Sequence, residues 1–122
     1  MTEARTTDAG AVFRDSPVPE GEPFRLVFVQ HTERSSTAVA RVRPGGGIKP
    51  HIHREHDEII TLLEGEAEFR IGDETRTVRA GETVSVPAGI VHAPFRSAGG
   101  CLFVTVFAPA FDPDAPDRHF VD

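Results

Sequence analysis

The sequence predicts an all-β fold, either a barrel or a sandwich, built as a single domain. Short stretches rich in β-branched and aromatic residues recur along the chain, and glycine or proline turns separate them every eight to twelve residues. One stretch, residues 66–71, alternates between polar and apolar side chains, which is the period of a half-buried strand. The length of 122 residues suffices for one hydrophobic core and is too short for two ordinary domains.

The N-terminal third is predicted to contribute two strands after a flexible arm. Residues 1–22 are polar and contain prolines, so we expect an arm that ends in at most one short strand. Residues 24–29 are rich in strand-forming side chains, and residues 37–42 form a second such stretch. Pro44 and the three glycines after it then interrupt the chain, because proline lacks a backbone donor and glycine accepts positive φ angles.

The middle of the chain is predicted to form three strands joined by tight turns. Residues 59–63 are apolar on both faces, so we expect a strand that is covered on both sides. Glu64 and Gly65 are expected to form a turn before the alternating strand. A second turn at residues 72–73 leads into a short polar strand at residues 75–79.

The remaining strands follow the same rhythm. After a turn at residues 80–81, Val84 and Val86 are expected to point inward from one strand, and residues 90–95 and 101–107 complete the sheet. The segment after them is rich in proline and aspartate and has no apolar stripe of helical period. The predicted organisation is an N-terminal arm (1–22), a β-barrel (23–108) and a C-terminal tail (109–122).

Composition and charge exclude several classes of partner. The apolar fraction of 39% is typical of a globular protein, and the net charge of −6 with no cluster of basic residues argues against nucleic acid. The single cysteine, Cys101, cannot form a disulfide within the chain. The first ten residues do not resemble a secretory signal, and no apolar run approaches the ~20 residues that span a bilayer. We therefore expect a cytoplasmic protein that binds no membrane.

Four side chains stand out as candidate metal ligands. His51 and His53 lie two residues apart, so on a strand both imidazoles leave the same face. Glu58 follows after the polar residues 54–57, which are expected to turn the chain. A fourth ligand must come from another strand, and His92 is the natural candidate. Three imidazoles and a carboxylate are typical ligands of a transition-metal ion.

These residues also carry a resemblance to a known family. The pattern G-x5-H-x-H-x4-E-x6-G over residues 45–65 is similar to the first cupin motif, and G-x5-P-x-G-x2-H over residues 81–92 resembles the second. The resemblance covers roughly residues 41–107 and implies a double-stranded β-helix, the cupin or jelly-roll barrel, with an ion inside its open end. The second motif usually closes with asparagine four positions after its histidine, where this chain has Arg96.

The four candidate ligands narrow the identity of the metal to a group of transition metals but do not select one of them. Three histidines and one glutamate suit divalent Fe, Mn, Co, Ni, Cu or Zn. An octahedral ion with four protein ligands keeps two positions open, which favours a catalytic site over a closed structural one.

Two further residues are candidates for catalysis. His56 either replaces Glu58 as a ligand, lies behind the ligands, or is a solvated turn residue. Arg96 has the strand parity of His92, so it either points into the barrel and binds a substrate carboxylate or phosphate, or pairs with a surface acid. His31 and His119 are expected at the surface, and Cys101 either lines the barrel or packs as a small buried residue. Four phenylalanines are expected in the core: Phe69, Phe95, Phe103 and Phe107.

The resemblance implies a metal-dependent enzyme that acts on a small organic molecule. Oxygenase, isomerase, epimerase and cyclase chemistry all occur in the family, and we favour an oxygenase-like or tailoring reaction. The alternatives are a non-catalytic small-molecule binder or sensor and a structural, storage-like protein, of which the second is less favoured because the ligand set is complete. By analogy with small members of the family we also expect a homodimer.

Overall fold

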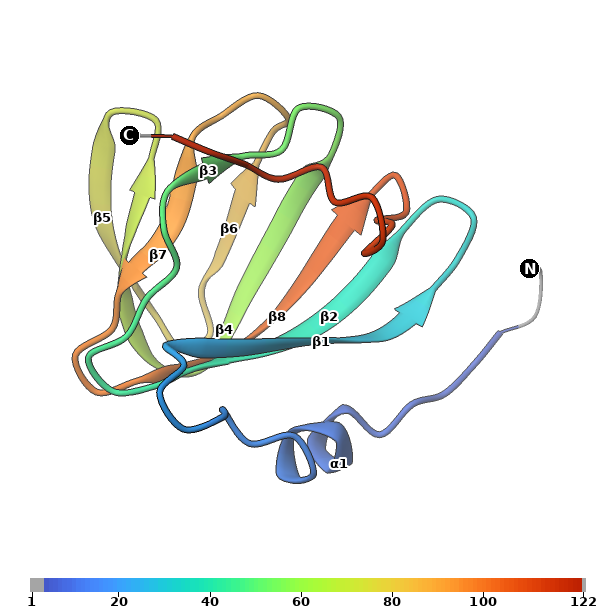
Figure 1. Ribbon diagram of the computed structural model, residues 1–122, viewed down its shortest axis with the longest axis horizontal. Coiled ribbons are helices and arrows are strands. Elements are labelled where there is room, and N and C mark those ends of the chain that lie inside the picture. Colours follow the sequence, from blue (N-terminus) through green and yellow to red (C-terminus); the bar gives the residue numbers. More distant parts are fainter. Residues whose placement is uncertain (1–3, 122) are drawn as a thin grey trace.

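The computed structural model describes residues 4–121, which fold into a curled antiparallel sheet with one short helix beside it (Figure 1). The strands form a barrel of the double-stranded β-helix type, as the sequence predicts. The elements are α1 (Ala9–Arg14), β1 (Phe24–His31), β2 (Ser36–Val42), β3 (His51–Ile52), β4 (Asp57–Ile71), β5 (Glu74–Arg79), β6 (Thr83–Val86), β7 (His92–Arg96), β8 (Cys101–Ala108) and β9 (His119–Phe120).

The strand order is β1-β2-β8-β4-β7-β3-β9, and β5 and β6 both pair with β4. Strand β4 is therefore shared by the two halves of the barrel. Its first half pairs with β8 and β6, and its second half pairs with β5 and β7. In Figure 1 the C-terminal segment crosses the same end of the barrel as β3.

The turn predicted at Glu64 and Gly65 is wrong, because β4 runs through this position without a break. The pairing with β8 instead shifts register between Leu62 and Glu64, which bends the strand from one half of the barrel to the other. Gly65 is required at the bend. Its φ angle is +78°, and a Cβ atom there would collide with the backbone oxygen of Gly100.

Strand β4 also corrects the expectation that residues 59–63 are covered on both faces. Ile60 and Leu62 are 1% and 0% exposed and belong to the core. Ile59 and Leu63 point the other way and are 44% and 47% exposed. The apolar run therefore buries only one face within a single chain.

A short helix interrupts the N-terminal segment that was expected to be an irregular arm. The side chain of Asp8 accepts a hydrogen bond from the backbone N–H of Ala11 at 3.0 Å and caps α1. Phe13 is 9% exposed and packs with Val39 and Leu102 on the outer face of the sheet. The helix therefore covers apolar surface of the sheet, while residues 1–3 lie outside the described part of the chain.

The barrel core is aromatic and aliphatic. Phe69, Phe103 and Phe107 are all less than 5% exposed, as predicted, whereas Phe95 is 37% exposed and lies outside the core. Cys101 is buried in the same core cluster. Among residues 4–121, no helix is long and apolar enough to cross a membrane.

A pair of neighbouring leucines tests this packing. We expect Leu62→Ala to lower the free energy of unfolding by about 2–5 kcal/mol, because it leaves a cavity in the core, and Leu63→Ala to lower it by less than about 1 kcal/mol. Urea denaturation followed by circular dichroism measures both. An equally large loss for Leu63→Ala would show that this face is covered in solution, as in the homodimer expected from the sequence.

Candidate metal centre

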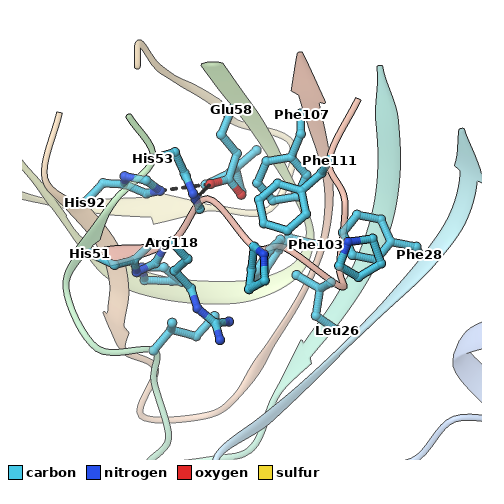
Figure 2. Close-up of a pocket in the computed structure, with 15 residues that line it drawn as sticks. Leu26, Phe28, His51, His53, Glu58, His92, Phe103, Phe107, Phe111 and Arg118 are labelled. Carbon is cyan, nitrogen blue, oxygen red and sulfur yellow. Dashed lines mark hydrogen bonds and ion pairs between the residues drawn. The ribbon is translucent and has the colours of Figure 1, made fainter. Parts of the chain in front are cut away.

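The candidate metal centre lies at the open end of the barrel, where three strands bring its residues together. His51 and His92 are register partners on β3 and β7, and Glu58 enters from the start of β4. His53 follows β3 directly, and its ring turns to the same side as that of His51 (Figure 2). All four side chains are buried, with exposed fractions of 1–5%.

The potential ligand atoms of these four residues lie within 4.8 Å of one another. The Oε1 atom of Glu58 is 3.1 Å from Nε2 of His53 and 2.8 Å from Nε2 of His92. The ring of His51 completes the group, with its centroid 4.5 Å from that of His92. The structure thus brings together the four residues that the sequence singles out. We call the group formed by His51, His53, Glu58 and His92 the metal cluster.

Backbone carbonyls fix the orientation of the three imidazole rings. Each Nδ1–H can donate to a carbonyl oxygen, which leaves Nε2 of a neutral ring as a free lone pair. The partners are Lys49 for His51, at 2.7 Å, Asp117 for His53, and Ile90 for His92, at 3.0 Å. The lone pairs of the rings therefore face the centre of the cluster.

This donor set fits a divalent transition-metal ion. Three Nε2 atoms and a carboxylate oxygen converge in a buried space, where only a shared cation or protons can relieve the repulsion between their lone pairs. Thr105 donates its hydroxyl hydrogen to Oε2 of Glu58 at 2.6 Å. This bond fixes the carboxylate so that Oε1 is turned to the imidazoles.

Electrostatics hold two of the ligands in the protonation state that a metal requires. Burial, together with the neighbouring histidines, lowers the pKa of His51 to about 4. Burial alone would raise the pKa of Glu58, but its contacts with His53 and His92 outweigh this effect and lower the pKa to about 2. Burial also opposes protonation of His53, yet Glu58 and the Asp117 carbonyl outweigh it and raise the pKa of that ring.

His56 lies behind the metal cluster rather than in it. Its Nδ1 is 2.7 Å from Oδ2 of Asp117 and its Nε2 is 3.1 Å from the carbonyl oxygen of Ala110, so both ring nitrogens are engaged. The side chain is 8% exposed, and the interpretation of His56 as a solvated turn residue is therefore wrong. It is also not among the residues whose ligand atoms converge.

Arg96 is exposed and does not line the cavity beside the metal cluster. The pairing of β7 with β4 shifts register at this point, because Glu68 faces Arg96 while the next residue, Phe69, faces Pro94. Phe95 is the extra residue, and it reverses the strand parity that relates Arg96 to His92. The expectation that Arg96 points into the barrel is therefore wrong, and the same bulge explains why Phe95 is exposed.

The sequence analysis did not identify Asp117, which holds the loop between His53 and Glu58 in place. Its carboxylate accepts hydrogen bonds from the backbone N–H groups of Arg54 and Glu55, at 3.0 and 2.7 Å. The carboxylate also contacts the ring of His56. Burial by itself would raise the pKa of Asp117, but the hydrogen bonds outweigh burial and hold this pKa well below its usual range. The hydrogen-bond partners of Asp117 lie some sixty residues earlier, so no local pattern predicts these contacts. The position of Asp117 after a proline indicates only a turn.

The segment expected to be a C-terminal tail is part of the site. Strand β9 pairs with β3, so that Phe120 faces His51 and His119 faces Ile52. His119, expected at the surface, is partly exposed and lies with its Nε2 3.1 Å from Oδ1 of Asp117. We call residues 109–121 the C-terminal strap, because this segment crosses the open end of the barrel.

A cavity of about 170 Å³ lies directly beside the metal cluster (Figure 2). Its remaining walls come from segments spread along the chain and are almost entirely apolar. They are formed by Leu26, Phe28, Ile48, Ile60, Pro94, Phe103, Phe107, Phe111, Pro113, Pro116 and Arg118. Four buried side chains that could hold a metal ion therefore line an apolar cavity.

Comparison with known proteins assigns the family. Residues 38–107 match the cupin domain, so the chain belongs to the cupin family. A protein of Thermus thermophilus, TT1209, has a similar structure with a TM-score of 0.74 and 28% identity, covering 86% of this chain and 97% of that one. Wheat (Triticum aestivum) oxalate oxidase GF-3.8 is 35% identical over 86 residues, which are 64% of this chain and 37% of the oxidase.

An uncharacterised protein of Aquifex aeolicus (strain VF5) is 30% identical over 63 residues, which are 52% of both chains. This chain thus spans about half the length, or less, of these sequence relatives. The comparisons therefore establish the family and the fold, while the reaction has to be argued from the site.

Metal affinity should fall as the pH is lowered. Binding requires neutral imidazoles, and His53, whose pKa lies above 6.5, is the first of the shifted rings to take up a proton. We expect the apparent affinity for Zn²⁺ to drop about tenfold per pH unit below the pKa of His53, and more steeply near the pKa of His51, about 4. Titration with a competing chelator between pH 8 and 5 measures this. Constant affinity over that range would contradict histidine ligation.

Asp117 should support the metal centre without binding the metal. We expect Asp117→Ala to weaken Zn²⁺ binding by about 10–100-fold, because the loop that carries His53 and Glu58 loses its anchor. Asp114→Ala, an exposed change in the same strap, is the matched control. Calorimetric titration of both variants decides the point, and equal affinities would show that the Asp117 carboxylate does not order the ligands.

Proposed function

We propose that this protein is a metal-dependent enzyme that acts on a small organic molecule by oxygenase-like or isomerase or cyclase chemistry. The observation that carries the proposal is the convergence of four buried ligand atoms, from His51, His53, Glu58 and His92, at the wall of a cavity of about 170 Å³. A structural site is normally closed by its ligands, whereas this one borders space for a substrate.

The chain's own residues would each have a defined role. The three histidines and Glu58 would hold one divalent Fe, Mn, Ni, Co, Cu or Zn ion, with the rings oriented by their Nδ1–H bonds. Such an ion, when bound, supplies Lewis-acid polarisation of a substrate oxygen and, if it is redox-active, electron transfer. The apolar walls of the cavity exclude water and strengthen the electrostatic interactions inside it.

The sequence relatives give this proposal limited support. GF-3.8 is an oxalate oxidase, so a cupin barrel with 35% identity to this chain performs chemistry on a small acid. A non-catalytic binder or sensor, the alternative considered from the sequence, would also bind a metal and contain the cavity, but it would not convert a substrate. A cytoplasmic location and a homodimer stay predictions.

The test is metal analysis of the purified protein, followed by turnover assays with each metal restored. We expect Glu58→Gln and His92→Ala to lower metal affinity and turnover by more than about 100-fold, because each leaves a gap in the ligand set. Glu55→Gln, an exposed glutamate in the same loop, is the matched control and should retain both. Metal binding without turnover on a broad panel of small acids, alcohols and ketones would favour a binder. Turnover that survives both ligand variants would overturn the proposal.

A further inference from the structure

The cavity beside the metal cluster has polar groups at two places in a lining that is otherwise apolar. One is the metal cluster itself. The other is Arg118 of the C-terminal strap, an exposed residue and, within residues 4–121, the only charged one among the remaining lining residues. Its guanidinium lies 5.3 Å from the ring centroid of Phe120, and no carboxylate within residues 4–121 forms an ion pair with it. A guanidinium in this position is available to an anionic ligand.

The body of the cavity is an aromatic wall made by Phe28, Phe107 and Phe111. The centroid of Phe111 is 4.7 Å from that of Phe107 and 5.7 Å from that of Phe28, so the three rings form one continuous surface. In Figure 2 this wall lies on one side of the cavity, and the histidines and Arg118 lie on the other. A ligand between them meets aromatic faces on one side and polar groups on the other.

The size of the cavity limits what fits. A volume of about 170 Å³ is close to the roughly 150 Å³ of an apolar cavity known to accept benzene, so one six-membered ring fills it. A two-carbon dicarboxylate such as oxalate would leave the aromatic wall without a partner. Burying a polar anion against apolar walls is also unfavourable unless each oxygen finds a charged or hydrogen-bonding group.

We propose that the site takes an aromatic monocarboxylate with a single ring, whose ring packs on Phe28, Phe107 and Phe111 and whose carboxylate binds Arg118. This inference rests on the proposed function, because it names the substrate class of the same cavity. Arginine binds carboxylates through two parallel N–H donors, and ring stacking adds orientation.

Ligand binding to the full chain loaded with Zn²⁺ tests the proposal without a turnover assay. Isothermal titration with benzoate, benzamide and acetate separates charge from ring. We expect benzoate to bind more tightly than either of the others. Arg118→Gln should weaken benzoate binding about tenfold or more and leave benzamide binding unchanged, because a charge-assisted bond is lost. The matched control is Arg96→Gln, at the exposed arginine outside the cavity, which should change neither.

Variants of Phe28 test the aromatic wall. This residue is suitable because it is only half-buried. Phe28→Ala should weaken benzoate binding and raise the affinity for 2-naphthoate relative to benzoate, because it enlarges the cavity by about one ring. Phe28→Leu keeps apolar volume and should retain the preference for the smaller ring. A variant that only damages the fold would lower both affinities together and would also lose Zn²⁺.

The outcomes distinguish this inference from the proposed function. Equal benzoate affinities for Arg118→Gln and Arg96→Gln, or binding of acetate as tight as that of benzoate, would overturn the substrate class while leaving metal-dependent catalysis intact. Failure of the protein to bind any divalent ion of Fe, Mn, Ni, Co, Cu or Zn would overturn the proposed function. Binding of benzoate that depends on Arg118, with no turnover of any aromatic acid, would support the ligand class and favour the binder.

Discussion

The structure depends on one constraint, the burial of three imidazoles around a single carboxylate. Glu58 contacts His53 and His92 through one oxygen and Thr105 through the other, which lowers its pKa to about 2 although it is almost fully buried. A buried charge of this kind is tolerated only where every lone pair has a partner. The barrel meets this requirement because β3, β4 and β7 each bring one part of the cluster to the same end.

The C-terminal strap crosses the open end of the barrel. It contacts both the candidate ligands and the cavity. Asp117 binds the loop after His53 through its carboxylate and the ring of His53 through its carbonyl group. The next residue, Arg118, lines the cavity. One short segment thus orders the loop between His53 and Glu58 and also supplies a charged side chain to the cavity lining.

The cavity explains why the cupin fold alone does not define a reaction. A cupin barrel supplies the ligand cluster, and oxalate oxidase GF-3.8 shows that a relative of this chain acts on a small acid. In this chain the space beside the cluster is bounded by Phe28, Phe107 and Phe111, and Arg118 is its only other charged lining residue in the described part of the chain. The shape and polarity of that space, rather than the ligands, carry the information about the substrate.

The sequence by itself predicted the four candidate ligands from local spacing, and it indicated the family through the resemblance of two motifs. The spacing of His51 and His53 places two rings on one face, and two motifs of fixed spacing predict a barrel that brings Glu58 and His92 to them. Tertiary structure decided whatever depends on register or on contacts between distant segments. A bulge at Phe95 turned Arg96 outward, and a shift within β4 replaced the predicted turn at Gly65. The roles of Asp117 and Arg118 arise only when the strap crosses the barrel, since no local period links them to residues some sixty positions earlier.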